Sequence, residues 1–258
     1  MPIKRAKLLR LLLPAMVCST STLAAGADVQ TQRPADFVNV QKRVPQIQTD
    51  MRYLTAHNFV GRRVHGYEAP VCLLTEPAAQ ALQSVVLRLL PMGLTLKVYD
   101  CYRPQTAVND FAAWASDVKD VKMRTEFYPT VDKTRLFDDG YIAYQSGHSR
   151  GSTVDVTIVP LASPIPAQVS GQKQVSCTAP VSQRTPDNSL DFGTGFDCFS
   201  PVSHPDDQSV PPPARANRLL LQSLMEQAGF KRLDTEWWHF TLANEPYPST
   251  YFDFPVDD

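Results

Sequence analysis

The sequence has no apolar run long enough to cross a bilayer, no internal repeat and almost no excess of charge of either sign. The apolar run near the N-terminus, Leu11 to Val17, is far shorter than the roughly 20 residues that a spanning helix needs. The 25 basic and 26 acidic residues give a formal net charge of −1. This near-balance gives no reason to expect nucleic acid or an anionic membrane as a partner.

The first residues follow the pattern of a secretory signal peptide. Residues 4–10 contain four Lys and Arg side chains, the short apolar run follows, and small residues lead up to Ala27. This order is typical of exported proteins. We therefore expect residues 1–27 to be removed and the mature chain, residues 28–258, to be periplasmic or secreted, with no membrane partner. Removing four of the 25 basic residues leaves 21 against 26 acidic ones, a net charge near −5.

Cysteine is scarce, and its placement fits export. Cys18 would leave with the signal peptide, so the mature chain keeps Cys72, Cys101, Cys177 and Cys198. No C-x-x-C pair is present, which argues against a zinc–thiolate site. In an oxidising compartment four cysteines are expected to pair, and three pairings are possible. The spacing favours Cys177–Cys198, which would close a Pro- and Ser-rich loop, together with Cys72–Cys101.

Hydrophobic periodicity predicts helices and strands that alternate along the chain. The predicted helices span about residues 75–90, 104–114 and 214–228, and the strands span 94–98, 153–159 and 237–242. Thr75 is placed to cap the first helix, and Pro77 suits its first turn. Residues 28–70 are mixed and loop-like, and residues 160–213, rich in Pro, Ser and Gln, are expected to form a long surface loop.

The strands alternate apolar and polar side chains, as expected for half-buried strands. This pattern favours an α+β fold over a doubly wound parallel sheet, whose strands are continuously apolar. About 230 residues suffice for one well-buried domain. We therefore expect a single α+β domain, with a small, mostly antiparallel sheet flanked by helices and the functional site at the sheet.

Two short segments carry side chains that a catalytic metal site needs. The first holds His148 and Asp155, and the second, Glu236-Trp237-Trp238-His239, holds a carboxylate and an imidazole. A catalytic zinc takes three ligands of these types, leaves one position open and needs a nearby carboxylate base that is not a ligand. By spacing alone this signal is weak, because such pairs occur by chance and paired tryptophans more often pack in a core.

The second segment carries a geometric condition. Residues three apart in a regular strand face opposite sides of the sheet. Glu236 and His239 can therefore address one metal only if Glu236 precedes the strand proper or a bulge separates the two. The first segment meets no such difficulty, because His148 lies on a glycine-flanked turn and Asp155 on the polar face of the strand that follows.

Much of the chain resembles the zinc D-alanyl-D-alanine dipeptidases, the family of the vancomycin-resistance enzyme. The resemblance runs in order from about Asp50 to Val256. Its most specific motifs are Ser146-x-His148-Ser149-Arg150-Gly151-Ser152-x-x-Asp155, Glu236-Trp237-Trp238-His239, Asp100-x-Tyr102-Arg103-Pro104 and Gly193-Thr194-x-Phe196-Asp197. It implies zinc-dependent hydrolysis of a small D-amino-acid dipeptide, D-Ala-D-Ala, with one Zn²⁺ per chain.

The resemblance also implies roles for seven residues. They are His148, Asp155 and His239 as zinc ligands, Glu236 as general base, Arg103 as oxyanion stabiliser, and Tyr53 and Ser146 near the dipeptide's amino terminus. By residue type alone, Tyr53 fits a core aromatic and Ser146 a turn residue as well as these roles, and a surface cation is the lesser alternative for Arg103. In an exported enzyme the implied role is recycling or scavenging of dipeptide released by cell-wall turnover.

Two alternative functions share this zinc architecture. One is a D,D-carboxypeptidase that trims peptidoglycan stem peptides in an open cleft. The other is a non-catalytic zinc module that binds wall fragments, although such a module has no need of Glu236 or Arg103. Two departures from the family pattern bear on substrate choice. Gly147 stands where resistance-type relatives often carry Ser, and the loop of residues 160–190 looks longer, so that it narrows the pocket or reaches a larger ligand.

Overall fold

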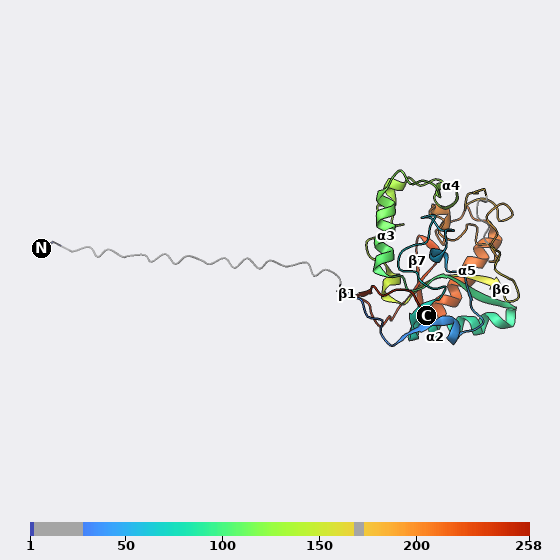
Figure 1. The fold of residues 1–258 in the computed structure, drawn as a ribbon, viewed down its shortest axis with the longest axis horizontal. Helices are drawn as coiled ribbons and strands as arrows, with labels where there is room; N and C mark the ends of the chain where they lie inside the picture. Colours follow the sequence, from blue (N-terminus) through green and yellow to red (C-terminus); the bar gives the residue numbers. More distant parts are fainter. Residues whose placement is uncertain (3–27, 168–172) are drawn as a thin grey trace.

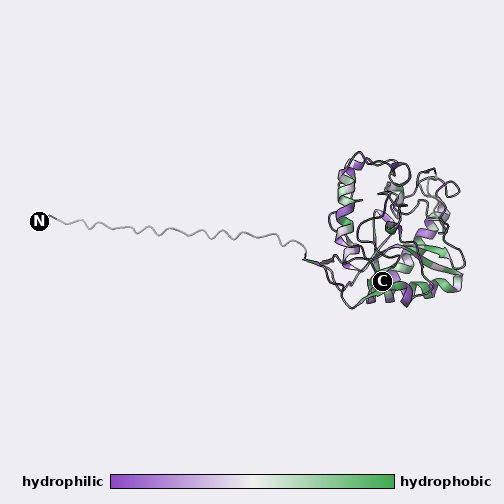
Figure 2. Cartoon of the chain, viewed as in Figure 1, coloured by the Kyte–Doolittle hydropathy of each residue, from purple (hydrophilic) through white to green (hydrophobic). Residues whose placement is uncertain are grey.

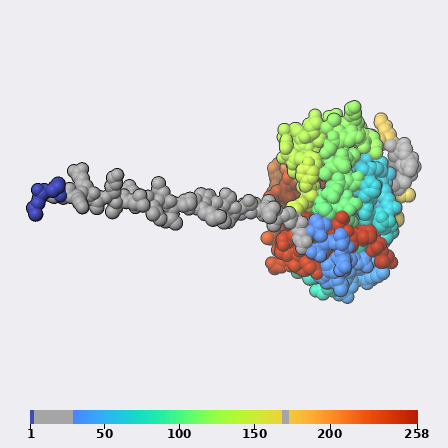
Figure 3. Space-filling model, turned by 60° about the vertical axis from the view of Figure 1, so that its left-hand side comes forward, coloured from blue at the N-terminus to red at the C-terminus, as the bar shows by residue number. Residues whose placement is uncertain are grey.

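The computed structural model describes residues 1–2, 28–167 and 173–258 (Figure 1). Residues 3–27, which carry the predicted signal peptide and Cys18, lie outside the described residues. No helix in the described ranges is long and apolar enough to span a membrane. Residues 28–30 lie beside the C-terminal segment, because strand β1 (Asp28–Gln30) pairs with β9 (Thr250–Phe252). On the face of the folded body shown in Figure 3, segments that follow residue 28 and segments near the C-terminus, blue and red, accordingly lie side by side.

A five-stranded sheet forms the centre of the molecule. Its order is β3-β5-β6-β8-β7, and every neighbouring pair is antiparallel except β3–β5. The strands are β3 Gln48–Thr49, β5 Leu94–Asp100, β6 Thr153–Pro160, β7 Phe230–Leu233 and β8 Glu236–Leu242. A small separate pair consists of β2 Phe37–Asn39 and β4 Leu73–Thr75. The predicted α+β fold with a mostly antiparallel sheet is confirmed.

Two long helices cover one face of this sheet. They are α2 (Glu76–Leu89), which packs on β5, and α5 (Pro212–Gln227), which packs on β7 and β8 beside α2. Their apolar sides meet the sheet residues Val154, Val156 and Ile158 in the main core. Figure 2 shows α2 alternating between hydrophobic and hydrophilic residues while the central strands are largely hydrophobic. The remaining helices are α1 Val40–Arg43, α3 Gln105–Ser116 and α4 Arg124–Phe127.

The predicted helices and disulfides are present, with one local difference. Cys72 pairs with Cys101 and Cys177 with Cys198, as the spacing favoured. Thr75 does occupy the N-cap position of α2, but its side chain does not cap the helix. Its hydroxyl instead lies 2.7 Å from that of Ser152. This contact ties α2 to the start of β6, a long-range pairing that local sequence patterns do not show.

The opposite face of the sheet is covered as well, which the sequence analysis did not predict. Lys97 of β5 has no exposed surface, because its ammonium donates to Asp187 and Asn188 from the long loop. Strand β5 is therefore buried on both faces, and the prediction of a half-buried strand was wrong. Ion pairing explains the result, since a lysine can be buried when its charge is matched.

The prediction of a surface loop over residues 160–213 was also wrong in its second half. Phe192, Phe196, Cys198 and Phe199 are almost fully buried. The ring of Phe196 stacks on Tyr99 of β5, with centroids 4.3 Å apart. Aromatic anchors and a disulfide thus hold a segment without regular structure against the sheet. That segment and the sheet together form the walls of two cavities.

Candidate active site

Three side chains meet at the polar face of the sheet. Asp155 in β6 and His239 in β8 are directly paired across the antiparallel strands, and His148 lies on the short helical turn Gly147–Arg150 before β6. Nε2 of His148 lies 3.3 Å from Nδ1 of His239 and 3.3 Å from Oδ1 of Asp155, and the latter two atoms lie 3.2 Å apart. The three atoms form a nearly equilateral triangle.

This triangle fits a metal ion. Two ligands of a tetrahedral zinc, each about 2.0–2.1 Å from the metal, lie roughly 3.3–3.4 Å apart. Oδ1 of Asp155 is buried and accepts no hydrogen bond from the described residues, so its lone pairs remain available. Burial by itself would raise the pKa of Asp155, but the two histidines hold that pKa well below its usual range. The carboxylate is therefore ionised, as a metal ligand must be.

The backbone orients His148. Nδ1 of His148 lies 2.7 Å from the carbonyl oxygen of Cys101, which can only accept a hydrogen bond. Nδ1 therefore carries the proton, and Nε2 presents its lone pair to the triangle. Burial lowers the pKa of His148, which favours the neutral ring. An imidazole whose second nitrogen is held by a carbonyl is the usual arrangement around metal ions.

Glu236 stands beside the triangle. It is the first residue of β8, and the register of the β7–β8 pair shifts between Arg232 and Leu233. This irregularity brings Oε2 of Glu236 to 3.5 Å from Nδ1 of His239. The geometric condition set by the three-residue spacing is thereby met. Burial raises the pKa of Glu236 to about 7, which suits a group that takes up and releases a proton near neutral pH.

Arg103 occupies the opposite wall and is not a surface cation. Its guanidinium donates through Nε to Oδ2 of Asp100 at 2.9 Å, and Asp100 also accepts from the hydroxyl of Tyr67. The guanidinium lies over the rings of Tyr53 and Phe111, 5.2 and 5.0 Å from their centroids. Its Nη2 atom is 3.8 Å from the carboxylate of Asp155. Arg103 is thus held rigidly next to the triangle.

Tyr53 and Ser146 each combine a local contact with a place in the pocket wall. The buried hydroxyl of Tyr53 donates to Oδ2 of Asp197 at 2.8 Å. Ser146 behaves as a turn residue, because its hydroxyl accepts from the backbone N–H of His148. That hydroxyl also lies 3.5 Å from Nη1 of Arg103. Both residues are therefore structural elements of the pocket as well as candidates for substrate contact.

Sequence reasoning assigned no role to two carboxylates of the site, Asp100 and Asp197. Asp197 lines the pocket and has a left-handed backbone with φ of 57°, which is uncommon for a residue other than glycine. Burial raises the pKa of Asp197 well above its usual range. Each aspartate stands in a motif already noted, Asp100-x-Tyr102-Arg103 and Gly193-Thr194-x-Phe196-Asp197. In the sequence, their places in these motifs were the only signal that pointed to the two aspartates.

Most of these groups line one pocket of about 250 Å³, namely Tyr53, Arg103, Ser146, Asp155, Asp197, Glu236 and His239, whereas His148 and Asp100 are buried behind its wall. Its outer wall is the segment from Gly140 to Gly147, and Phe199, Phe111 and Val108 provide apolar surface. No described residue between 160 and 190 lines it. The loop of residues 160–190 therefore does not narrow this pocket through any residue that the structure describes. The segment from Gly140 to Gly147 narrows it instead.

Comparison with known proteins gives a consistent result. A family model described as D-ala-D-ala dipeptidase matches residues 33–169 and 170–257. The D-alanyl-D-alanine dipeptidase of Streptomyces coelicolor is 37% identical over 221 residues, which cover 86% of this chain and 98% of that protein. The protein of the same name from Enterococcus faecalis is 32% identical over 85% of this chain and 98% of its own length. The one from Escherichia coli is 30% identical over 80% and 84%.

Proposed function

Because this chain belongs to the D-Ala-D-Ala dipeptidase family of metallopeptidases, we propose that it hydrolyses free D-alanyl-D-alanine to two molecules of D-alanine. We further propose one Zn²⁺ per chain, held by His148, Asp155 and His239, within a catalytic domain of residues 28–258. The observation that carries this proposal is the triangle of ligand atoms at 3.2–3.3 Å with the carboxylate of Glu236 beside it.

The side chains of the pocket support a hydrolytic mechanism. A bound zinc would supply Lewis acidity to the scissile carbonyl and to the attacking water. Glu236 takes the proton of that water on its carboxylate and delivers it to the leaving amine. Arg103, which is always charged and is held in place by Asp100, stabilises the negative charge that develops on the carbonyl oxygen.

The pocket also suits a substrate with a free amine. Asp197 accepts a hydrogen bond from Tyr53, and both residues face the pocket. An ammonium group placed there would find the carboxyl of Asp197 and a phenolic oxygen, and its charge would favour the ionised form of a carboxyl whose pKa burial raises, whereas an acylated amine brings no such charge. The cavity of about 250 Å³ is smaller than the roughly 300 Å³ lower limit of pockets for drug-sized ligands. These features favour a dipeptide over a peptidoglycan stem and therefore disfavour the carboxypeptidase alternative.

The cysteines bear on where the enzyme works. Two disulfides in one chain are typical of oxidising compartments. Together with the signal-like N-terminal sequence, they support export to the periplasm or beyond. An exported dipeptidase meets dipeptide released from the cell wall, so recycling or scavenging of turnover products is the proposed role.

The test is hydrolysis by the purified protein in the presence of zinc. We expect cleavage of D-Ala-D-Ala, little cleavage of L-Ala-L-Ala, and kcat/KM at least ~1,000-fold lower for N-acetyl-D-Ala-D-Ala and for a stem pentapeptide, a gap of about 4 kcal/mol. Comparable rates on the pentapeptide would favour the carboxypeptidase. Absence of hydrolysis of every peptide by zinc-loaded protein would leave the non-catalytic module.

A further inference from the structure

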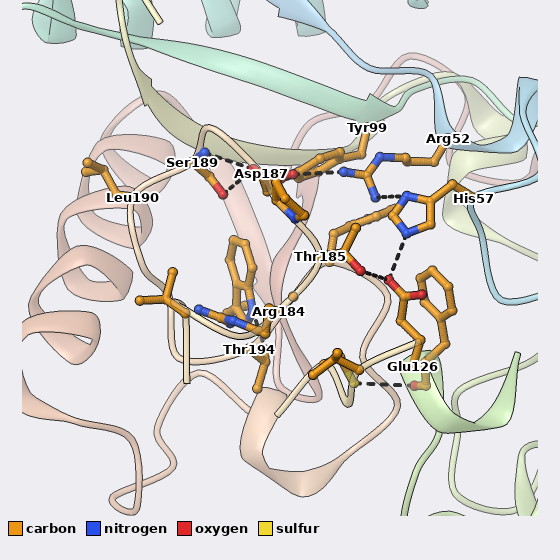
Figure 4. Close-up of a pocket in the computed structure, with 18 of the residues that line it drawn as sticks. Arg52, His57, Tyr99, Glu126, Arg184, Thr185, Asp187, Ser189, Leu190 and Thr194 are labelled. Atoms are coloured by element: carbon orange, nitrogen blue, oxygen red, sulfur yellow. Dashed lines mark hydrogen bonds and ion pairs between the residues drawn. The ribbon is translucent and has the colours of Figure 1, made fainter. Parts of the chain in front are cut away.

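A second cavity lies behind the catalytic pocket, beneath the loop of residues 181–190 (Figure 4). Its volume is about 220 Å³, close to that of the catalytic pocket. The two cavities share no lining residue in the described part of the chain. The second cavity is thus a separate space of similar size, and the proposed dipeptidase mechanism makes no use of it.

Most charged groups in this cavity already have partners. Arg52 donates to Asp187 at 2.8 Å, and His57 lies 2.7 Å from Glu126, which also accepts from the hydroxyl of Thr185. Figure 4 shows these contacts along the upper and right-hand walls. Because each carboxylate faces a donor, the pairs leave little capacity for an additional cation.

Arg184 is the exception. Its side chain lines the cavity and is only 9% exposed, and Nη2 is paired with the carboxylate of Asp191. Nη1 is buried and has no hydrogen-bond partner within the described ranges. A guanidinium stays charged and carries two N–H donors on that nitrogen. The unmet capacity beside the cavity is therefore for an anionic acceptor, which Nη1 contacts when the Arg184 side chain turns toward the cavity, and a planar carboxylate matches guanidinium geometry.

The rest of the lining limits the ligand further. Trp237, Phe196 and Leu190 supply apolar surface, while Glu126 and Asp187 would repel a second negative charge. The volume lies below the roughly 300 Å³ of pockets for drug-sized ligands. We propose that this cavity is an accessory binding site for a small monocarboxylate with an apolar, preferably aromatic, body, whose carboxylate binds Arg184.

The accessory site abuts the catalytic pocket through the backbone. At three places, one residue lines the accessory site and its neighbour in the chain lines the catalytic pocket. The pairs, with the residue of the accessory site first, are Arg52 and Tyr53, Phe196 and Asp197, and Trp237 and Glu236. A ligand in the accessory site therefore lies directly behind the groups proposed to hold the substrate amine and the catalytic base.

Calorimetric titration of the zinc-loaded protein with benzoate tests this site, with benzamide as the neutral isostere. We expect saturable binding of benzoate and at least ~10-fold weaker binding of benzamide, since a charged acceptor strengthens a hydrogen bond by about that factor. Arg184→Lys keeps the charge beside Asp191 but removes the forked donors, so benzoate should bind at least ~10-fold more weakly. Hydrolysis of D-Ala-D-Ala by this variant should continue.

Two further variants separate this site from the catalytic pocket. Arg103→Lys changes only the catalytic pocket and should leave benzoate affinity unchanged. Val181→Trp, at an exposed position of the cavity rim, should block benzoate entry even if Arg184→Lys fails to fold. The proposal is overturned if benzoate does not bind, if benzamide binds equally well, or if Arg103→Lys abolishes binding that Arg184→Lys and Val181→Trp leave intact.

Discussion

At the scale of single residues, three ligand atoms of the site converge on one point, and the other polar groups lie around them. The ligand atoms of His148, Asp155 and His239 lie mutually 3.2–3.3 Å apart, whereas Glu236 approaches only His239, at 3.5 Å. A metal ion centred on the triangle would therefore be held without Glu236. This division allows metal binding and catalysis to be tested separately.

Substitution Glu236→Gln should lower kcat by at least ~100-fold, the scale for loss of a general base, while about one zinc per chain is retained. Metal analysis by atomic emission and steady-state kinetics on the same preparation check this. His148→Ala is the matched control, because it removes a corner of the triangle and should lose the metal. Glu236→Gln protein that came out free of metal would show that Glu236 is itself a ligand.

Close packing around position 147 explains why this chain has glycine where related enzymes often carry serine. A Cβ atom there would lie 2.7 Å from Oγ1 of Thr153, which is hydrogen-bonded to Thr241 and stiff because it is β-branched. Gly147→Ala should therefore lower the free energy of unfolding by about 1–3 kcal/mol. In a Thr153→Ala background the same change should cost less, with a coupling of at least ~0.5 kcal/mol in denaturant unfolding. Additive effects would mean that the clash is relieved elsewhere.

At the scale of elements, each disulfide is attached to a different part of the site. Cys101 provides the carbonyl that accepts from His148, and its partner Cys72 lies just before β4. Cys198 directly follows Asp197, the residue that holds Tyr53. One disulfide thus anchors the metal side of the pocket and the other the proposed amine side.

Removal of either disulfide should lower the free energy of unfolding by a similar amount, but the two removals should affect different steps of function. The sequence separations of 29 and 21 residues predict a loss of about 3 kcal/mol for each. Cys72→Ala with Cys101→Ala should weaken zinc affinity about 10-fold or more, as loss of a group that orients a ligand does. Cys177→Ala with Cys198→Ala should instead raise KM for the dipeptide. Competition with a zinc chelator and steady-state kinetics distinguish them, and identical profiles would contradict separate roles.

At the scale of the whole molecule, the proposed zinc would link parts of the chain that are far apart in sequence. The turn before β6, strand β6 itself and strand β8 contribute one ligand each, and His239 of β8 lies 91 residues beyond His148 and 84 residues beyond Asp155. A ligand that binds only the folded state stabilises it by about 2.7 kcal/mol at 100 times its dissociation constant. The metal is therefore expected to contribute to stability as well as to catalysis.

Chelation of zinc should accordingly lower the melting temperature of the wild-type protein, and added zinc should restore it. Calorimetric melts in a chelator and after zinc addition measure the change. In His239→Ala the melting temperature should no longer respond to zinc, because one ligand is missing. A wild-type melting temperature that is the same with and without zinc would contradict metal binding to the folded chain at this triangle.

Processing of the chain is testable at the same scale. Mass spectrometry of protein from the native cell should show a chain that begins near Gly26 or Asp28 and contains no free thiol, because all four mature cysteines are paired. An intact Met1 with all five cysteines reduced would place the enzyme in a reducing compartment and contradict the proposed role in recycling.

The sequence by itself indicated the longer helices and strands and favoured the two disulfides. Helix α2 and strand β6 were evident from periodicity, since a stripe of apolar residues can be buried in only one local conformation. Cysteine spacing favoured the observed pairing, and the motifs placed His148, Asp155 and His239 as candidates before any geometry was available. The helices and strands depend on neighbours within a few residues, and the candidate residues were identified from short local motifs.

Only the tertiary structure decided how distant segments meet. Burial of Lys97 depends on Asp187, which lies 90 residues further along, and the place of Asp197 depends on Tyr53. The triangle itself required the pairing of Asp155 with His239 and the irregular register that turns Glu236 toward it. Arg184 and the accessory cavity depend on a loop without periodicity. Contacts of this kind arise from side chains far apart in sequence, which no local pattern encodes.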